Sequence, residues 1–354
     1  MLKLKNLVVA ATLFVAAGAM ASNFRAADQV YVPAAGHLSG ASGTFISDIF
    51  ISNLSTDSVT VSIILSSGIT GTQQNFNNAL TLAAGERREI NDFFPTTLGL
   101  SAGFGQLIFN ACKTGGNCTS SCPGVDANGN CPDFRPISVE SRIYQILSNC
   151  AATYSTAVCT AATSQATQPT TGQLFAGIPW YNFVSSAASG AGLDKTFVTG
   201  LRNTGGAGSN GTYRGNIGLV NASQFSTTTL VVKLFDGKTG AQIGSTFTQT
   251  LAPLGQAQPS LGSIFPAFTG ATATNAYVTV EQTNNIKTAD ADANNCSDGC
   301  PAFFAYGSVL DNASGDATTL EPQFLVQLNQ NAIFCIYNQT CKGTFTIKRA
   351  VKHQ

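Results

Sequence analysis

Residues 59–66 read Val-Thr-Val-Ser-Ile-Ile-Leu-Ser, and their pattern indicates the fold class. Apolar side chains recur at every second position, as in a β-strand with one face in a core and the other mostly toward solvent. Segments 137–143 and 230–234 alternate in the same way. Gly, Asn, Asp and Ser fill the gaps between such runs. We therefore expect an all-β protein, with short helical turns around 91–98 and 260–268.

The same motifs occur twice along the chain. Gly43-Thr44-Phe45 returns as Gly211-Thr212-Tyr213, and Asn53-Leu54-Ser55 returns as Asn221-Ala222-Ser223. A unit of about 150 residues has the usual size of a domain. Short alternating strands bounded by turns predict two tandem homologous β-sandwich (Ig-like) domains with disulfide-stapled loops. Two more repeated pairs are Thr81-Leu82-Ala83 with Thr250-Leu251-Ala252, and Phe94-Pro95 with Phe265-Pro266.

The N-terminus has the pattern of a secretory signal. Lys3 and Lys5 precede an apolar run over 7–19, and small residues at Ala19 and Ala21 then mark a cleavage site. The run is shorter than the roughly 20 residues that cross a bilayer. We expect cleavage after Ala21, no membrane span afterwards, and a secreted or cell-surface location, with the periplasm and a retained N-terminal anchor as alternatives.

Composition shifts set the expected domain boundaries. An Ala/Thr/Ser-rich stretch with few large apolar residues separates the two units, and apolar strand-like runs follow the second one. The predicted parts are a signal peptide (1–21), sandwich unit one (22–150), a connector (151–172), sandwich unit two (173–322) and a C-terminal β extension (323–354).

All ten cysteines lie beyond the signal. An even number of cysteines in an exported chain indicates disulfides. Zinc is disfavoured, because the Cys-x3-Cys spacings have no His nearby. We expect local pairs, namely Cys150 with Cys159, Cys335 with Cys341, Cys296 with Cys300, and Cys112, Cys118, Cys122 and Cys131 among themselves.

Charge and composition exclude several classes of function. The 18 basic residues balance 18 acidic ones, so the chain has no basic field for nucleic acid. Only two histidines occur, His37 and His353. No Cys-x-x-Cys-His motif is present to attach haem c.

Beyond these motifs, an aromatic-Val pair opens each unit, as Tyr31-Val32 and Phe197-Val198. The whole pattern, over roughly 29–322, resembles a group of exported bacterial proteins, mostly of unknown function, built from tandem β-sandwich (Ig-like) units. The resemblance implies a secreted or surface-displayed protein. Its motifs are fold signatures, so it implies no catalytic residue.

Two insertions at matching places in the units carry oxygen-rich side chains beside cysteines. Oxygen donors at alternate positions suit Ca²⁺, but the EF-hand pattern fails because Gly at its sixth position and Glu at its twelfth are missing. Turns in which Asp and Asn bond their own backbone are the alternative. The calcium candidates are Asp126, Asn128, Asp290, Asp292 and Asn294, and no other cofactor is expected.

Catalytic patterns are sparse. His37 lacks a Gly-x-Ser-x-Gly partner motif, and the glycine-rich stretch 206–211 precedes a strand where dinucleotide binding needs a helix. The charged cluster 86–89 is typical of a solvated strand. Glu140, Glu281, Asp311 and Glu321 lie on or near strands, but sequence gives no separation between them. We assign no catalytic residue.

The sequence thus predicts a non-enzymatic secreted or surface protein with a structural or adhesive role, whose loops and strand edges meet a protein or glycan partner. A carbohydrate-binding protein is the alternative, with Trp180 and Tyr181 stacking on a sugar or else packing between the units. A carboxylate-based secreted hydrolase ranks third. Because loops on rigid scaffolds carry binding, we expect the two cysteine-rich insertions to hold the function.

Overall fold

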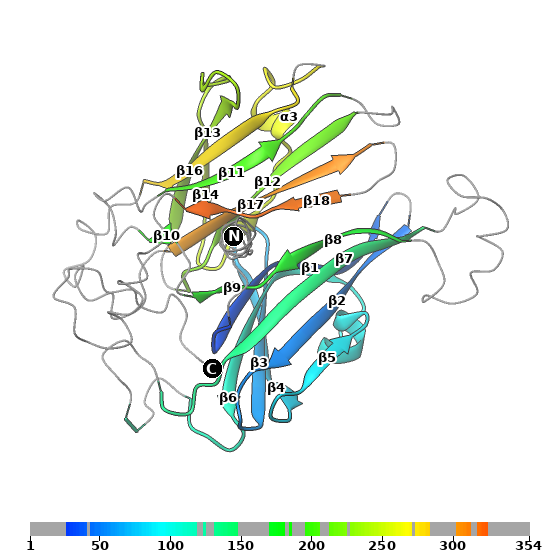
Figure 1. Ribbon diagram of the computed structural model, residues 1–354, viewed down its shortest axis with the longest axis vertical. Helices are drawn as coiled ribbons and strands as arrows, with labels where there is room; N and C mark the ends of the chain where they lie inside the picture. The colour runs from blue at the N-terminus through cyan, green and yellow to red at the C-terminus, as the bar shows by residue number, and fades with distance from the viewer. Residues whose placement is uncertain are drawn as a thin grey trace, which may run out of the picture.

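The computed structural model of the chain is shown in Figure 1. It describes residues 26–40, 43–118, 123–124, 131–147, 170–180, 184–185, 195–205, 212–224, 227–270, 273–283, 302–312 and 317–324. Regular structure in these ranges is mainly β-strand, and the strand pairings are antiparallel. The predicted all-β class is confirmed.

The first half of the chain forms a nine-stranded sheet that folds over into two layers. Strand β1 connects the two layers, because its residues 29–37 pair with β6 whereas residues 38–40 pair with β2. One layer is β4-β3-β6-β1 with β9 beside β1, and the other is β5-β2-β7-β8. The strands are β1 (Gln29–Gly40), β2 (Gly43–Asn53), β3 (Val59–Ser67), β4 (Thr72–Leu82), β5 (Arg87–Ile90), β6 (Gly103–Lys113), β7 (Ile137–Leu147), β8 (Thr170–Ala176) and β9 (Ile178–Pro179).

Strand β3 contains the stretch whose pattern indicates the fold class. Val61 and Ile63 are fully buried in the core, as the alternation predicts. The opposite face was expected to lie mostly toward solvent, yet Ile64 and Ser66 are also fully buried. The second half of the chain covers this face, which a local pattern does not reveal.

The second half forms two five-stranded sheets. One has the order β10-β17-β12-β15 with β18 beside β17, and the other has the order β14-β13-β16-β11-β19. Alternate residues of these strands, such as Ile217, Leu219, Leu230 and Val232, fill the core between the sheets. The strands are β10 (Val184–Ser185), β11 (Lys195–Leu201), β12 (Tyr213–Asn221), β13 (Thr228–Asp236), β14 (Phe247–Leu251), β15 (Gln256–Ala257), β16 (Ala276–Gln282), β17 (Ala302–Asp311), β18 (Ala317–Leu320) and β19 (Gln323–Phe324).

Both expected helical turns are present. The turn η1 (Phe94–Leu98) carries Pro in its first turn, and α3 (Leu261–Ile264) starts at Ser260, whose side chain accepts a hydrogen bond from the Ser263 N–H. Among the described residues, no helix has the length and apolar character to cross a membrane.

The two halves pack through aromatic side chains. The ring of Tyr31 meets Phe304 edge to face at 6.4 Å, and its hydroxyl donates to the Ala222 carbonyl at 3.3 Å. Phe175 and Tyr306 form a second edge-to-face pair at 5.3 Å. In Figure 1, β8 of the first half lies beside β18 of the second. The halves therefore share buried apolar surface instead of being separated by solvent.

Strand β17 serves two cores. Phe303 and Ala305 point into the core of the second half, whereas Phe304 and Tyr306 belong to the core of the first. All four are buried. This position between two cores explains why residues 302–306 are continuously apolar, since a strand covered on both faces has no solvent side.

A turn of the second half also locks onto a hairpin of the first. The Ala252 N–H donates to the Ile69 carbonyl at 3.0 Å, and the Gln256 N–H donates to the Gly68 carbonyl at 2.9 Å. A Cβ added at Gly71 would lie 1.9 Å from the Pro253 carbonyl oxygen, so only glycine allows this approach.

Leu254 sits at the centre of that turn. It is fully buried in the core cluster of the first half, and its φ of 56° is rare for a residue with a side chain. Its carbonyl accepts hydrogen bonds from Ser66 Oγ at 2.9 Å and Gln106 Nε2 at 2.7 Å. These contacts hold an unfavourable backbone conformation in place.

The pairings shift one expected boundary. Strands β8 and β9 cover 170–179 and pair with β7 and β1, so these residues belong to the first half. The predicted boundary between connector and second unit, at 172–173, is therefore too early, because the small polar residues that suggested a linker there run directly into a strand. The predicted signal peptide, residues 151–169 of the connector, and 325–354 lie outside the described residues.

Candidate functional site

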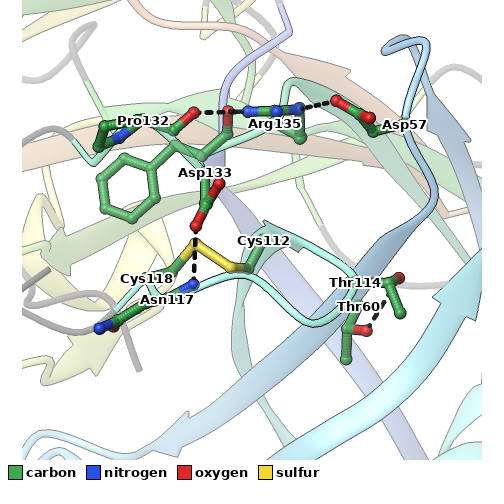
Figure 2. Close-up of a disulfide and its surroundings, with 10 residues drawn as sticks. Asp57, Thr60, Cys112, Thr114, Asn117, Cys118, Pro132, Asp133 and Arg135 are labelled. Atoms are coloured by element: carbon green, nitrogen blue, oxygen red, sulfur yellow. Dashed lines mark hydrogen bonds and ion pairs between the residues drawn. A yellow bond between two sulfur atoms is a disulfide. The ribbon is translucent and has the colours of Figure 1, made fainter. Parts of the chain in front are cut away.

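The first cysteine-rich insertion leaves the sandwich at the end of β6 and returns before β7. Its described ends, residues 112–118 and 131–135, are called the insertion base here. A disulfide joins Cys112 to Cys118, with Cα atoms 5.9 Å apart (Figure 2). The bond fixes the first residues of the insertion to β6, within the set of cysteines predicted to pair among themselves.

Polar contacts brace the insertion base against the sandwich (Figure 2). Arg135 Nε donates to Asp57 Oδ2 at 2.7 Å, and Lys113 Nζ lies 3.3 Å from Asp57 Oδ1. The Asn117 N–H donates to Asp133 Oδ2 at 2.8 Å. Charge-assisted contacts to Asp57 therefore hold both segments of the insertion base, and the Asn117–Asp133 bond joins the segments to each other. The disulfide closes the first segment on β6.

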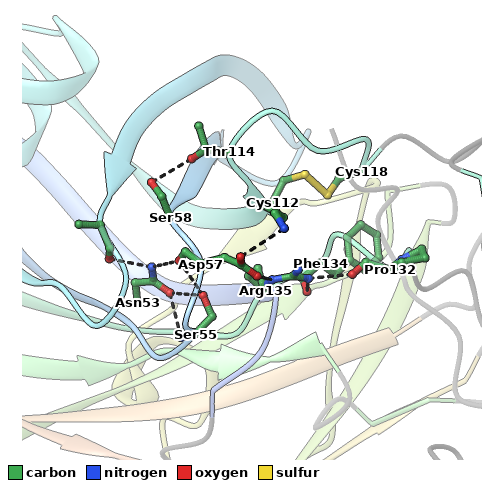
Figure 3. A network of polar contacts seen from close by, with 12 residues as sticks. Asn53, Ser55, Asp57, Ser58, Cys112, Thr114, Cys118, Pro132, Phe134 and Arg135 are labelled. Carbon is green, nitrogen blue, oxygen red and sulfur yellow. Dashed lines mark hydrogen bonds and ion pairs between the residues drawn. A yellow bond between two sulfur atoms is a disulfide. The ribbon is translucent and has the colours of Figure 1, made fainter.

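Asp57 connects this brace to the neighbouring turn. The hydrogen bonds from Arg135, and then Lys113, hold the pKa of the Asp57 carboxyl below its ordinary value. The backbone carbonyl of Asp57 accepts from Asn53 Nδ2 at 2.8 Å (Figure 3). The insertion base and the end of β2 thus form one polar network.

The two Asn-x-Ser motifs make matching contacts. Asn53 Nδ2 also donates to the Ala83 carbonyl at 2.8 Å, and Asn221 Nδ2 donates to the Ala252 carbonyl at 2.8 Å. In each motif the side-chain Oδ1 accepts the backbone N–H of the following serine at 3.0 Å. Both asparagines are fully buried. The repeated motif is therefore structural, because it satisfies backbone groups at a strand end.

Most candidate ligands of the insertions fall outside the described part of the chain. Cys131 is described and disulfide-bonded. Within the described ranges, no group of three or more His, Cys, Asp or Glu side chains is placed to hold a metal ion. Outside the described residues lie Cys122, Cys150, Cys159, Cys296, Cys300, Cys335, Cys341, Asp126, Asn128, Asp290, Asp292, Asn294, Tyr181 and the glycine-rich stretch 206–211.

Trp180 lies inside the protein. It is 4% exposed, belongs to the core cluster of the first half, and donates through Nε1 to Asp28 Oδ1 at 3.2 Å. An indole in this setting packs and presents no open ring face to a sugar.

His37 has a partner that sequence reasoning missed. Its Nδ1 lies 2.7 Å from Asp92 Oδ1, and both side chains are 23% exposed. Asp92 stands just before η1, and no motif signals the pairing. Ser47 Oγ accepts the Gly36 N–H at 2.7 Å and is fully buried, so it is no accessible nucleophile beside the histidine. The pair links β1 to the loop before η1.

The carboxylates considered for hydrolysis have different surroundings. Burial raises the pKa of Glu140. Burial alone would also raise the pKa of Glu281, but hydrogen bonds from Lys233 at 2.9 Å and from Lys195 hold it below its ordinary value. Asp311 lies at the end of β17, opposite Tyr213 of β12, and Glu321 lies between β18 and β19.

The charged cluster 86–89 forms ordinary surface contacts. Glu86 pairs with Arg88 and accepts the Ala83 N–H, and these hydrogen bonds, the backbone one first, lower the pKa of Glu86. Comparison with protein-family models and with curated proteins finds no match for this chain.

Proposed function

We propose that this protein is an exported, non-enzymatic structural or adhesion protein, in which two homologous Ig-like sandwich units form a rigid body that presents its cysteine-rich insertions to a protein or glycan at the cell surface. The observation that carries the proposal is the insertion base. A loop that is cross-linked and ion-paired to a sandwich loses less conformational freedom when it binds, which favours affinity.

The strand pairings support a duplicated unit. The pairs β1–β6, β2–β7, β3–β4 and β7–β8 have counterparts in β11–β16, β12–β17, β13–β14 and β17–β18. The pairs β2–β5 and β3–β6 correspond to the B–E and C–F pairs of an immunoglobulin sandwich. The neighbours β7 and β1 stand where that fold has its A and G strands, so the relationship is to a variant order.

The test shortens both insertions and leaves the length of every described strand unchanged. Residues 116–131 and 285–300 are replaced by short Gly/Ser linkers, with Cys112→Ser, so that β6 and the Arg135–Asp57 contact are kept. A matched control, Cys112→Ser with Cys118→Ser, keeps the full length and opens only the described disulfide. Circular dichroism melts measure folding, and the distribution between cell surface and medium measures attachment.

We expect the shortened protein to stay folded and to be released from the surface, while the control is released partly. Unchanged attachment of the shortened protein would refute a binding role for the insertions. Loss of folding would show that they are structural staples instead.

A further inference from the structure

The face of the first half that receives the second has a counterpart in the second half, which the described residues do not cover in the same way. Tyr31, Ser66 and Gln106 make the side-chain hydrogen bonds to the Ala222 and Leu254 carbonyls. Equivalent positions follow from register: Ser66 pairs with Gln106 as Phe235 pairs with Tyr277, and Tyr31-Val32 corresponds to Phe197-Val198. The three contact positions of the first half are therefore aromatic in the second.

These aromatic residues form a row on the outer face of the β14-β13-β16-β11 sheet, called the aromatic face here. The rings of Phe235 and Tyr277 stack at 5.1 Å, and Phe197 lies 6.5 Å from Tyr277. All three are only partly buried. Aromatic side chains are enriched at the centre of protein interfaces, and partly exposed ones are free to join such a contact.

The polar pair beside the aromatic residues also differs between the two faces: it is an amide pair in the buried face and an ion pair in the aromatic face. Gln29 Nε2 donates to Asn110 Oδ1 at 2.7 Å in the buried face. Lys195 and Glu281 take these positions in the aromatic face and pair at 3.2 Å. An ion pair stays solvated when no partner is bound, whereas the amide pair of the buried face is shielded from water. The aromatic face therefore suits a partner that binds reversibly.

The docking turn also has a counterpart. Residues 83–86 of the first half occupy the place that 252–255 hold in the second, since Leu82 and Leu251 end equivalent strands. Gly85, at the place of Leu254, has a φ of 68° and open space around it. Ala83 and Ala84 are exposed. The backbone of this turn bonds to Asn53 and Ser55 of its own half, whereas the side chains of Ala83 and Ala84 point outward. The first half thus presents an exposed turn that is equivalent to the docking turn of the second half.

We propose that the aromatic face binds a second copy of this chain, whose turn 83–86 docks on it as turn 252–255 docks on the first half. The occupant follows from the chain's own interface, because the equivalent turn and the equivalent sheet face already meet once inside the molecule. The contact is heterologous, so repetition builds linear chains of molecules.

The intermolecular contact is weaker than the internal one. Phe304 and Tyr306 of β17 correspond to Ser138 and Glu140 of β7, so the supporting sheet face of the incoming copy is more polar. Less apolar surface is buried, and association is therefore reversible and concentration-dependent.

Two variants test the proposal on the purified full-length protein. Phe235→Asp blocks the aromatic face, and Ala84→Arg blocks the turn. Gln73→Asp, on exposed strand β4, is the matched control for an added charge. Molar mass is measured over a concentration series by light scattering or sedimentation, and circular dichroism melts check folding. If Phe235→Asp unfolds, Lys233→Asp replaces it.

We expect concentration-dependent association of the wild type and the control, loss of it in each blocked variant, and a 1:1 complex when the two blocked variants are mixed, because each keeps the site that the other lacks. A wild type that stays monomeric overturns the proposal. Association that survives Ala84→Arg, with no complex on mixing, overturns it in favour of two aromatic faces meeting each other. The measurement needs no cell surface, so its failure leaves the adhesive role above untouched.

Discussion

Asp48 is a carboxyl group held against the first half of the chain with 4% of its surface exposed. Its Oδ1 accepts the Asp92 N–H at 2.9 Å and the Tyr144 hydroxyl at 3.2 Å. Burial nevertheless outweighs these bonds and raises the pKa of Asp48 above its ordinary value of 3.8. The folded state therefore binds this proton more tightly than the unfolded state does.

From this direction we predict the pH dependence of stability. The ionised form of Asp48 opposes folding, so its contribution worsens as the pH rises from 3.8 through the folded-state pKa. Asp48→Asn keeps an oxygen acceptor and has no charge to bury, so it should stabilise the protein at pH 7 more than at pH 4. Chemical denaturation at both pH values checks this. Asp57→Asn is the control of opposite sign. The pKa of Asp57 is lowered, so its ionised carboxylate stabilises the fold above pH 3.8, and this substitution should destabilise the protein more at pH 7 than at low pH.

At the scale of elements, the two Asn-x-Ser turns fasten the ends of β2 and β12. Each asparagine amide donates to two backbone carbonyls, one of them the alanine carbonyl of the next strand connection. This geometry explains why the motif recurs together with Thr-Leu-Ala, whose alanine carbonyl is the acceptor.

We predict similar losses from Asn53→Ala and Asn221→Ala. Each removes two hydrogen bonds to backbone carbonyls, at about 0.5 to 1.5 kcal/mol per bond. Replacement by Asp should be no rescue, although its shape is the same, because a carboxylate cannot donate to a carbonyl. Denaturation midpoints of the four single variants measure this. A neutral Asn53→Asp would contradict the assigned donor role.

At the scale of the whole molecule, the junction makes one body from two halves. Leu254 places its side chain in the core cluster of the first half while its own strands belong to the second. Its counterpart Gly85 adopts the same left-handed backbone without strain. Burial of the Leu254 side chain between the halves offsets the cost of its unfavourable φ.

Leu254 variants therefore test the junction. Leu254→Ala loses the buried side chain and keeps the strained backbone, and should destabilise the protein by about 2 to 5 kcal/mol. Leu254→Gly loses the same side chain but relieves the strain, which amounts to about 1 to 2 kcal/mol. We expect the glycine variant to be the more stable of the two, the reverse of the usual order. Gly85→Ala, measured alongside, should lower the free energy of unfolding only by the cost of placing a residue with a side chain in this left-handed conformation, because an added Cβ meets no neighbour. Equal stability of the Ala and Gly variants would refute the strain argument.

The strand class, the helical turns at the Phe-Pro pairs and the repeated motifs could be predicted from the sequence, because alternation and turn chemistry are local properties of neighbouring residues. It also directed attention to the cysteines of the first insertion. It did not reveal the His37–Asp92 contact, the partners of Asp57 or the burial of Trp180, since each joins residues far apart in the chain. Which strand faces meet solvent depends on the packing of the two halves, and therefore follows from the tertiary structure alone. Ile64 and Ser66 are buried because the second half covers them, and 302–306 lack alternation because β17 lies between the two cores. This packing depends on the close approach of turn 252–255 to Gly71, which joins residues far apart in the chain.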